Sequence, residues 1–279
     1  MKVTNRTRQS VLIISLLFAL NTVLYSQGQK SPGAFSPEIG QQGKDVVWVP
    51  TPQALVEVML SMAKVTPLDY VIDLGSGDGR TVIAAAKLGA TAVGIEFNPD
   101  MVALSWENAR KEGVADEVKF IEGDLFEADL SVATVITMFL LPEINLRLRP
   151  ILLELEPGTR IVSNTFSMGN WEPDHKVVTE ENWNSWNTAL LWIVPANVEG
   201  NWKFADGELS LEQEFQMISG TYKANGITST INNGRLRGNS ISFSINSDNY
   251  TGTVEGNKMA GNISDISGNS KSAWIAARY

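Results

Sequence analysis

The segment that most constrains the fold is residues 71–80, where an apolar run enters a loop that contains three glycines. It reads Val-Ile-Asp-Leu-Gly-Ser-Gly-Asp-Gly-Arg and leads into an Ala-rich stretch, residues 80–88. Pro67 and Gly75 bound the apolar run, which therefore predicts a short buried strand, and the Ala-rich stretch predicts a helix. A strand, a glycine loop and a helix in this order are typical of a doubly wound α/β sheet, which binds ligands at the carboxyl ends of its strands.

Alternating strands and helices extend on both sides of this loop. The pattern predicts strands at 70–74, 91–95, 118–121, 134–140, 160–163 and 188–194, and helices at 52–63, 80–88, 99–111 and 143–154. We expect Thr51 to cap the first helix and Pro52 to start it. Strands that alternate with helices imply a largely parallel sheet covered on both faces.

Helical periodicity disappears after Pro195, where Gly, Asn, Ser and Thr dominate. Short alternating runs at 241–245 and 250–254 predict strands. Turns are predicted at the pairs Gly238-Asn239, Gly256-Asn257, Gly261-Asn262 and Gly268-Asn269. The pattern predicts an antiparallel meander or small barrel of about six to eight strands, starting near Val198. The aromatic residues expected to fill its core are Trp202, Phe215, Tyr222, Phe243, Tyr250 and Trp274.

Two carboxylates flank the glycine loop, Asp73 and Asp78. The loop spacing is Gly-x-Gly-x-Gly, whereas the dinucleotide-binding loop is Gly-x-Gly-x-x-Gly. Carboxylates at these positions would repel a pyrophosphate, but they suit a ligand that carries an ammonium and a sulfonium group. S-adenosylmethionine carries both groups, and we therefore expect it as the cofactor.

Two further acids follow predicted strands. Glu96 ends the second strand, where a carboxylate can accept hydrogen bonds from both hydroxyls of a ribose. Asp124 follows the third strand, where we expect it to accept from the adenine amino group. Either acid alone is most simply a solvated residue at a strand end, but the glycine loop and both acids in this order predict an adenosyl site.

Residues 73–80, 94–98 and 123–126 resemble motifs I, post-I and II of seven-stranded class I methyltransferases. Further strings narrow the resemblance to a small family of mitochondrial protein-lysine methyltransferases, which modify the ATP synthase c subunit and the adenine nucleotide translocase, and to its bacterial relatives. These strings are Val-Pro-Thr-Pro at 49–52, Asp-Leu-Phe at 124–126, Asp-Leu-Ser at 129–131, Phe-Leu-Leu-Pro at 139–142 and Trp-Glu-Pro at 171–173. The resemblance covers residues 46–195.

The resemblance implies a Rossmann-like sheet with strand order 3-2-1-4-5-7-6, in which the last inserted strand is antiparallel. Together with the residue pattern it assigns cofactor binding to Thr51, Asp73, Gly75, Ser76, Gly77, Asp78, Gly79, Arg80, Glu96, Asp124 and Leu125. For Arg80 two roles stay open, binding the methionine carboxylate of the cofactor or pairing with nearby acids.

The family places residues next to the transferred methyl group after the fourth strand, which here are Phe139, Leu140, Leu141 and Pro142. Their apolar walls replace the Asn-Pro-Pro-Tyr string of amide-nitrogen methyltransferases and disfavour an adenine or glutamine acceptor. A protein lysine is one candidate acceptor, because an apolar channel lowers the pKa of its amine by desolvation. No catalytic residue is assigned, since direct displacement needs orientation and a dehydrated site.

Composition excludes several other chemistries. A net charge of −9 and a pI near 4.8 argue against a nucleic-acid partner. The chain has no cysteine and one histidine, His175, so we expect no metal site and no disulfide. His175 is either a base or, more simply, a loop residue without a role in catalysis. For Trp171, Trp183, Trp186 and Trp192 we favour core packing over lining the crevice.

Residues 1–26 have the layout of a secretory signal peptide, with Lys2, Arg6 and Arg8 ahead of an apolar run at 11–20. We expect cleavage after Ser26, export to the periplasm or the extracellular space, and no stable membrane span afterwards. An uncleaved anchor and a mitochondrial presequence are the alternatives.

The expected organisation is then a signal peptide at 1–26, a flexible lead-in at 27–44, a methyltransferase domain at 45–197 and a β domain at 198–279. The function predicted is that of an S-adenosylmethionine-dependent methyltransferase. A catalytically silent cofactor-binding or scaffold protein of the envelope and an NAD-dependent oxidoreductase are the competing interpretations.

Overall fold

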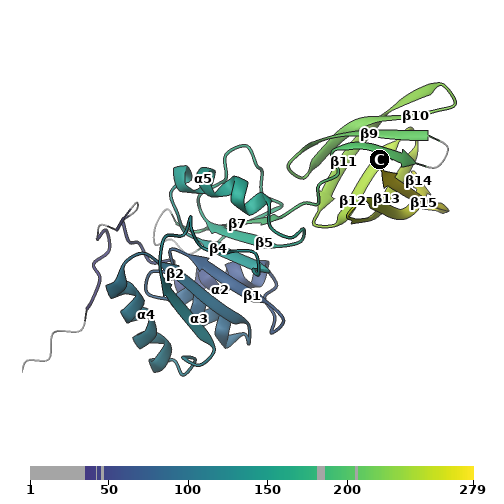
Figure 1. The fold of residues 1–279 in the computed structure, drawn as a ribbon. Helices are drawn as coiled ribbons and strands as arrows, with labels where there is room; N and C mark the ends of the chain where they lie inside the picture. Colours follow the sequence, from purple (N-terminus) through teal and green to yellow (C-terminus); the bar gives the residue numbers. More distant parts are fainter. Residues whose placement is uncertain (1–34, 42, 45–46, 181–185, 205–206) are drawn as a thin grey trace, which may run out of the picture. The chain divides into compact units, whose positions relative to one another are not determined.

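The computed structural model describes residues 35–279 apart from 42, 45–46, 181–185 and 205–206. This part of the chain holds a seven-stranded sheet with helices on both faces and a closed eight-stranded barrel (Figure 1). The expected signal peptide, most of the expected lead-in and Trp183 lie outside the described residues. No helix among the residues described is long and apolar enough to cross a membrane.

The sheet has the strand order β3-β2-β1-β4-β5-β7-β6 that the resemblance implies. Its strands are Tyr70–Leu74 (β1), Thr91–Glu96 (β2), Val118–Glu122 (β3), Val135–Met138 (β4), Arg160–Asn164 (β5), His175–Val178 (β6) and Thr188–Ile193 (β7). Strands β1 to β5 pair in parallel, whereas β7 is antiparallel to both β5 and β6. The residue pattern did not predict β6 because this edge strand is almost wholly exposed and lacks apolar alternation.

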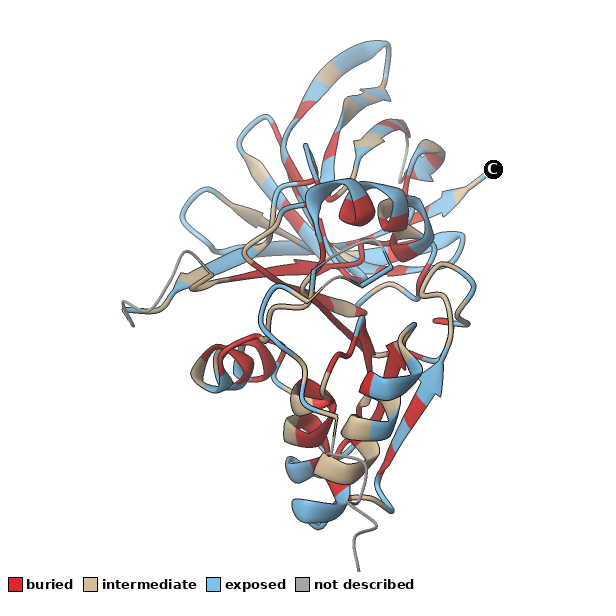
Figure 2. Ribbon diagram, turned by 90° about the vertical axis from the view of Figure 1, so that its left-hand side faces the viewer, coloured by how far each residue is buried: buried red, intermediate tan, exposed pale blue. Residues whose placement is uncertain are grey.

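The helices cover the two faces of the sheet as the alternating pattern predicts. They are Gln53–Met62 (α2), Arg80–Lys87 (α3), Pro99–Lys111 (α4) and Pro142–Leu153 (α5). Helices α2, α3 and α4 pack on one face, and α5 packs on the other (Figure 1). Because both faces are covered, the central strands are buried over most of their length, as Figure 2 shows in red.

The start of α2 differs from the expectation. Pro52 occupies the N-cap position, the helix begins at Gln53, and no side chain caps it, so the predicted capping role of Thr51 is wrong. The Thr51 hydroxyl instead accepts a hydrogen bond from the side chain of Asn164 at 3.3 Å. This contact ties the entrance of α2 to the end of β5, at the same edge of the sheet as the glycine loop.

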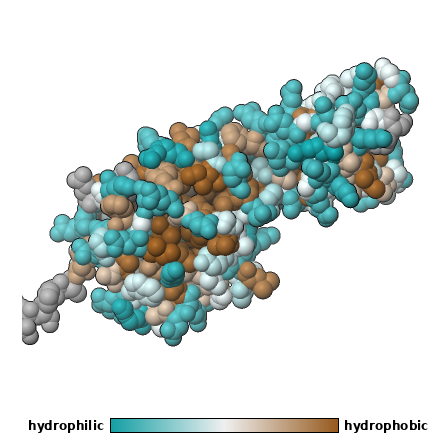
Figure 3. Space-filling model, viewed as in Figure 1, coloured by the Kyte–Doolittle hydropathy of each residue, from teal (hydrophilic) through white to brown (hydrophobic). Residues whose placement is uncertain are grey.

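The barrel is antiparallel and runs in sequence order, with β8 pairing both β9 and β15 to close it. Its strands are Gly200–Phe204 (β8), Gly207–Glu214 (β9), Met217–Ala224 (β10), Ile227–Arg237 (β11), Ser240–Ile245 (β12), Asp248–Glu255 (β13), Lys258–Asp265 (β14) and Ser270–Arg278 (β15). The predicted fold class is therefore confirmed for both parts. Buried and exposed residues alternate along the strands of the barrel. The visible surface of the barrel is mainly hydrophilic, whereas apolar residues gather on the visible surface of the sheet part (Figure 3).

Two expectations for the barrel are wrong. Gly261-Asn262 is not a turn but lies inside β14, where a Cβ on Gly261 would lie 1.9 Å from the carbonyl oxygen of Thr251. Glycine is needed there for the close approach of two strands. Phe215 lies between β9 and β10 and packs outside the barrel core, whereas Trp202, Phe243, Tyr250 and Trp274 fill that core as expected.

Candidate functional site

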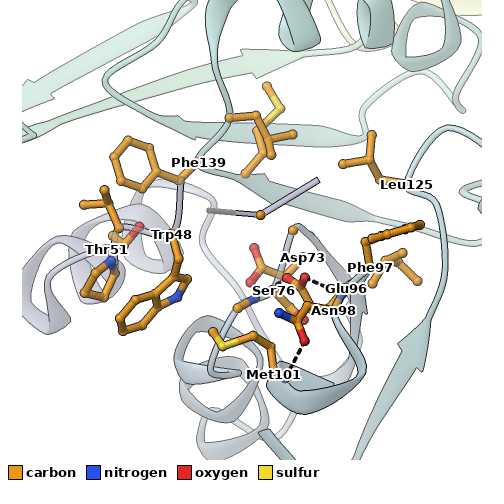
Figure 4. Close-up of a pocket in the computed structure, with 18 of the residues that line it drawn as sticks. Trp48, Thr51, Asp73, Ser76, Glu96, Phe97, Asn98, Met101, Leu125 and Phe139 are labelled. Atoms are coloured by element: carbon orange, nitrogen blue, oxygen red, sulfur yellow. Dashed lines mark hydrogen bonds between the residues drawn. The ribbon is translucent and has the colours of Figure 1, made fainter. Parts of the chain in front are cut away.

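A pocket opens where the carboxyl ends of the central strands meet (Figure 4). Its walls come from the glycine loop, the end of β2, the segments after β3, β4 and β5, and the chain ahead of α2. Every expected cofactor residue except Gly79 lines it. In Figure 4, Thr51 and Phe139 lie on one side of the pocket, and Phe97 and Leu125 lie on the opposite side.

The glycine loop exposes its backbone to this pocket. Gly75 and Gly77 have φ angles of 73° and 53°, which side-chain-bearing residues rarely adopt. A Cβ on Gly77 would lie 2.8 Å from the indole Nε1 of Trp48, so the loop also accommodates a tryptophan. Gly79 is instead the N-cap of α3, and a Cβ there would lie 2.8 Å from the ring of Phe120. The third glycine therefore allows close helix packing.

Asp73 is the buried carboxylate beneath the loop. It accepts a hydrogen bond from the Thr137 hydroxyl at 2.7 Å. Burial, helped by the charges of Asp78 and Glu96, raises the pKa of Asp73 to about 7. Next to it, the buried hydroxyl of Ser76 has no hydrogen-bond partner among the described residues. This corner of the pocket thus offers a carboxylate and a hydroxyl to a ligand that carries a positive charge.

Arg80 is held by two partners within the chain. Its guanidinium meets the carboxylate of Asp78 as a fork, with Nε at 2.9 Å and Nη2 at 2.5 Å from the two oxygens. Its Nη1 donates to the carbonyl oxygen of Thr51 at 2.9 Å. Of the two roles open for Arg80, the structure contains the pairing with an acid, and this pairing ties the glycine loop to the entrance of α2.

Both oxygens of Glu96 are fixed by backbone donors. Oε2 accepts from the Gly77 N–H and Oε1 from the Asn98 N–H, each at 2.9 Å. Because each carboxylate oxygen has a further lone pair, Glu96 can still accept from two hydroxyl groups. The preorganised geometry suits the vicinal diol of a ribose.

Asp124 lines the pocket just after β3, on the same side as Glu96, and already has a partner. Its carboxylate accepts from Lys44 Nζ at 2.7 Å and from the Phe126 N–H at 3.0 Å, and the Lys44 hydrogen bond is the main reason that its pKa is lowered. Lys44 also lies 4.5 Å from the ring centroid of Phe97. Neither Lys44 nor Trp48 was expected in the site, although Trp48 directly precedes the Val-Pro-Thr-Pro string.

The segment after β4 contributes Phe139, Leu140 and Leu141 to the pocket, whereas Pro142 begins α5 and does not line it. Phe166 and Trp186 join this wall. The residue pattern did not assign Phe166 to the site, and the preference for core packing is wrong for Trp186, which is only partly buried and lines the pocket. Trp171 and Trp192 are fully buried core residues, in line with the preference for packing. His175 is an exposed residue of β6, not a loop residue, and lies outside this pocket.

The residues present fit an adenosyl cofactor that carries a sulfonium and an ammonium group. The loop backbone at Gly75 and Gly77, a fixed diol acceptor at Glu96, the buried carboxylate of Asp73 and the hydroxyl of Ser76, which has no partner among the described residues, supply the necessary donors and acceptors. The cationic side chains that line the described pocket, Lys44 and Arg80, are both bound to carboxylates. A pyrophosphate would therefore meet acids without available counter-charges.

Comparison with known proteins agrees with this geometry. Residues 73–175 match the family described as the ANTKMT methyltransferase domain. The chain is 43% identical over 152 residues to a protein-lysine N-methyltransferase of Saccharolobus islandicus, which is 53% of this chain and 94% of that protein. It is also 43% identical over 106 residues to the human lysine N-methyltransferase of the ATP synthase c subunit. That match spans 38% of this chain and about half of the human protein, 46%.

Among solved structures, the chain resembles an RNA methyltransferase from Salinibacter ruber that was crystallised in complex with S-adenosyl-L-homocysteine. The sequence identity is 51%, the TM-score is 0.51, and the match covers 54% of this chain and 96% of that protein. The matches to the Saccharolobus islandicus and Salinibacter ruber proteins thus each cover about half of this chain.

Proposed function

Since the chain belongs to the family of ANTKMT methyltransferase-domain proteins and is an S-adenosylmethionine-dependent methyltransferase, we propose an acceptor for the methyl group. The proposed acceptor is the side-chain amine of a protein lysine. The observation that carries the proposal is the similarity to a protein-lysine N-methyltransferase over nearly all of that relative's length. The apolar and aromatic wall after β4 supports it, because such a wall suits an amine that must lose its charge before it reacts.

Several residues of the site have roles in the proposed reaction. The cofactor, when bound, would supply an electrophilic methyl group on a sulfonium. Glu96 would orient the ribose, and Asp73 and Ser76 would hold the amino-acid part through hydrogen bonds and charge. Phe139 and Leu140 exclude water from the path of the incoming amine, whose pKa falls in this apolar surrounding. Orientation and dehydration account for the chemistry without a dedicated base.

RNA is a second candidate acceptor, because the similar protein from Salinibacter ruber is described as an RNA methyltransferase. The charge of this chain disfavours RNA. Binding to a phosphate backbone needs clustered Lys and Arg, but the formal net charge here is −9. Among the described residues that line the pocket, the cationic side chains are Lys44 and Arg80, and both already pair with acids. A lysine acceptor needs neither feature, since its own charge is complementary to an acidic protein.

The test is transfer of a radiolabelled methyl group from the cofactor into a cell extract by the purified full-length protein. We expect label that protease releases, RNase leaves in place, and acid hydrolysis recovers as methylated lysine. Two controls are an extract whose lysines have been acetylated, which should stay unlabelled, and the Glu96→Ala variant, which should incorporate much less label than the parent at a low cofactor concentration. Label in RNA, or in an amino acid other than lysine, would overturn the proposed acceptor.

We propose that the protein acts after export, since the basic and apolar pattern of residues 1–26 supports a signal peptide. A compartment that does not make the cofactor would then have to receive it, or the protein would have to bind it before export. Fusion of residues 1–40 to a reporter that is active only outside the cytoplasm, with sequencing of the mature N-terminus, tests this. A silent reporter that retains Met1 would contradict export.

A further inference from the structure

Three aromatic rings meet at one wall of the pocket. Phe139 directly follows β4, Phe166 follows β5, and Trp186 precedes β7. Because β7 runs antiparallel to β5, the start of β7 lies beside the end of β5, and all three rings reach the same edge of the sheet. The ring centroids are 6.0 Å apart for Phe139 and Phe166, 5.7 Å for Phe139 and Trp186, and 5.3 Å for Phe166 and Trp186.

The backbone that carries Phe166 is strained and firmly held. Thr165 has a φ of 61°, a conformation that a β-branched residue rarely adopts. The Phe166 carbonyl oxygen accepts from the Ser163 hydroxyl at 2.8 Å and from the Asn145 amide at 3.1 Å, and the side chains of Ser163 and Asn145 belong to fully buried residues. Strain of this kind persists where the surroundings over-determine the conformation, and it clusters at functional sites.

These rings form part of the pocket surface. All three are partly exposed, and all three line the pocket. In Figure 4, Phe139 lies beside Thr51, on the opposite side of the pocket from Phe97 and Leu125. Leu140 and Leu141, which follow Phe139 in the chain and also line the pocket, are apolar. A methylated ammonium group at this wall would therefore meet aromatic rings, and aromatic rings attract quaternary ammonium groups.

We propose that Phe139, Phe166 and Trp186 form an aromatic receptor for the acceptor amine, and that the receptor favours the amine more strongly with each methyl group it gains. The inference rests on the proposed function in that it takes the acceptor to be a lysine. In each transfer the nitrogen lone pair forms the new N–C bond, the S–C bond breaks, and its electron pair stays on sulfur. The proton that the amine gives up goes to water.

Retention of a partly methylated lysine follows from this preference. A methylated ammonium loses less hydration than a primary ammonium when it enters an aromatic site, so the receptor holds the product of one transfer in place for the next. The three rings are thereby specificity-determining residues for the number of methyl groups added. They do not supply or remove a proton.

Binding of a fixed cation tests the receptor without turnover. The probes are N-acetyl-trimethyl-lysine amide and its neutral isostere, in which carbon replaces the quaternary nitrogen, titrated into the full-length protein with S-adenosyl-L-homocysteine present. We expect the cation to bind about tenfold tighter than the isostere. Phe166→Leu and Trp186→Leu should abolish this preference, Trp186→Phe should retain most of it, and all three should bind S-adenosyl-L-homocysteine like the parent. Equal binding of the two probes to the parent, or an unchanged preference in both Leu variants, would overturn the proposal.

The matched control is Tyr279→Leu, which removes an exposed aromatic ring at the end of the chain, after β15. It should leave the preference intact. Mass spectrometry of methylated protein then separates the two proposals. Methylated lysine without any preference for the cationic probe would overturn the receptor alone. A clear preference in a protein that never methylates lysine would overturn the proposed acceptor and support the receptor as a site for another amine.

Discussion

Glu96 shows how one side chain organises the cofactor side of the site. Its two oxygens receive backbone N–H groups from the glycine loop and from the start of α4, so it joins two strand ends and keeps acceptor capacity toward the pocket. A carboxylate fixed in this way costs a ligand little reorganisation when the ligand binds.

Glu96→Ala should weaken binding of S-adenosylmethionine by roughly 1 to 3 kcal/mol, the range for leaving a buried polar partner unpaired. The fold should survive, because Glu96 is only partly buried. Calorimetric titration measures the affinity, and circular dichroism monitors the fold. Glu122→Ala, an exposed acid at the end of β3 that does not line the pocket, serves as the control. Unchanged affinity in Glu96→Ala would contradict the assignment of the ribose site.

Asp73 couples the site to pH. Its pKa is raised to about 7, and its charged form is the one that suits a cationic ligand. We therefore expect the affinity for S-adenosylmethionine to fall as the pH drops below about 7, approaching tenfold per pH unit well below the pKa. Titrations from about pH 5.5 to about pH 8.5 would detect this dependence. In Asp73→Asn it should be lost, together with much of the affinity, whereas Asp116→Asn, in an exposed turn, should keep the parent profile.

The raised pKa of Asp73 also makes the stability of the cofactor-free protein depend on pH, but in the opposite direction: stability falls as the pH rises. An acid whose pKa rises on folding binds more protons in the folded state, so its contribution is fully present below the unfolded pKa near 3.8 and is lost as the pH rises to about 7. Asp73→Asn should therefore stabilise the cofactor-free protein at neutral pH, on the order of a few kcal/mol. Denaturant unfolding at about pH 5, inside this window, and at about pH 8, above it, measures the change in stability. A destabilised Asn variant at the higher pH would contradict the buried-charge interpretation.

At the scale of elements, the barrel depends on glycine at places where strands nearly touch. Gly261 in β14 faces Gly252 in β13, and a Cβ on Gly261 would lie 2.5 Å from the Gly252 Cα. Alternating burial explains which face of each strand points inward, but this close approach is a property of the paired strands. The sequence shows a glycine at position 261 but does not show that this residue pairs with Gly252 of the adjacent strand.

Gly261→Ala should destabilise the barrel by roughly 3 kcal/mol or more, because backbone atoms of the adjacent strand cannot move aside. Gly256→Ala is the matched control, since no atom lies within 4 Å of its Cβ position and only its φ of 57° is unfavourable. This control should cost about 1 kcal/mol. Thermal unfolding of the two variants compares them, and equal losses would refute the close-approach argument.

At the scale of the whole molecule, the chain has separate hydrophobic cores. In the described part of the chain, two hydrophobic clusters lie on the two faces of the seven-stranded sheet, and a third fills the barrel. The sheet order is complete at β7, before β8 begins the barrel. Separate cores and separate hydrogen-bonded sheets are the features expected of units that fold on their own.

Residues 44–197 expressed alone should fold cooperatively and bind S-adenosylmethionine with the affinity of the full chain. Circular dichroism and calorimetric titration test both parts of this expectation. The full-length protein is the reference for both measurements. A fragment that folds but needs the barrel for cofactor binding would contradict a self-contained cofactor site and place barrel residues in it.

The sequence by itself determined the fold class, the place of the glycine loop and the order of the acids at the strand ends. Hydrophobic periodicity and turn residues act locally, so strands such as β1 and helices such as α4 were predicted within a residue or two of their observed bounds. The exposed strand β6 was not predicted, because an edge strand that buries almost nothing leaves no periodic signal.

Only the tertiary structure decided which side chains meet. Arg80 pairs with Asp78, Lys44 reaches Asp124 from far away in the chain, and Phe166 and Trp186 join Phe139 because β7 runs back against β5. Local pattern records whether a residue faces a core or solvent. The partner of a side chain depends on strand order and direction, which bring together residues whose separation along the chain carries no signal.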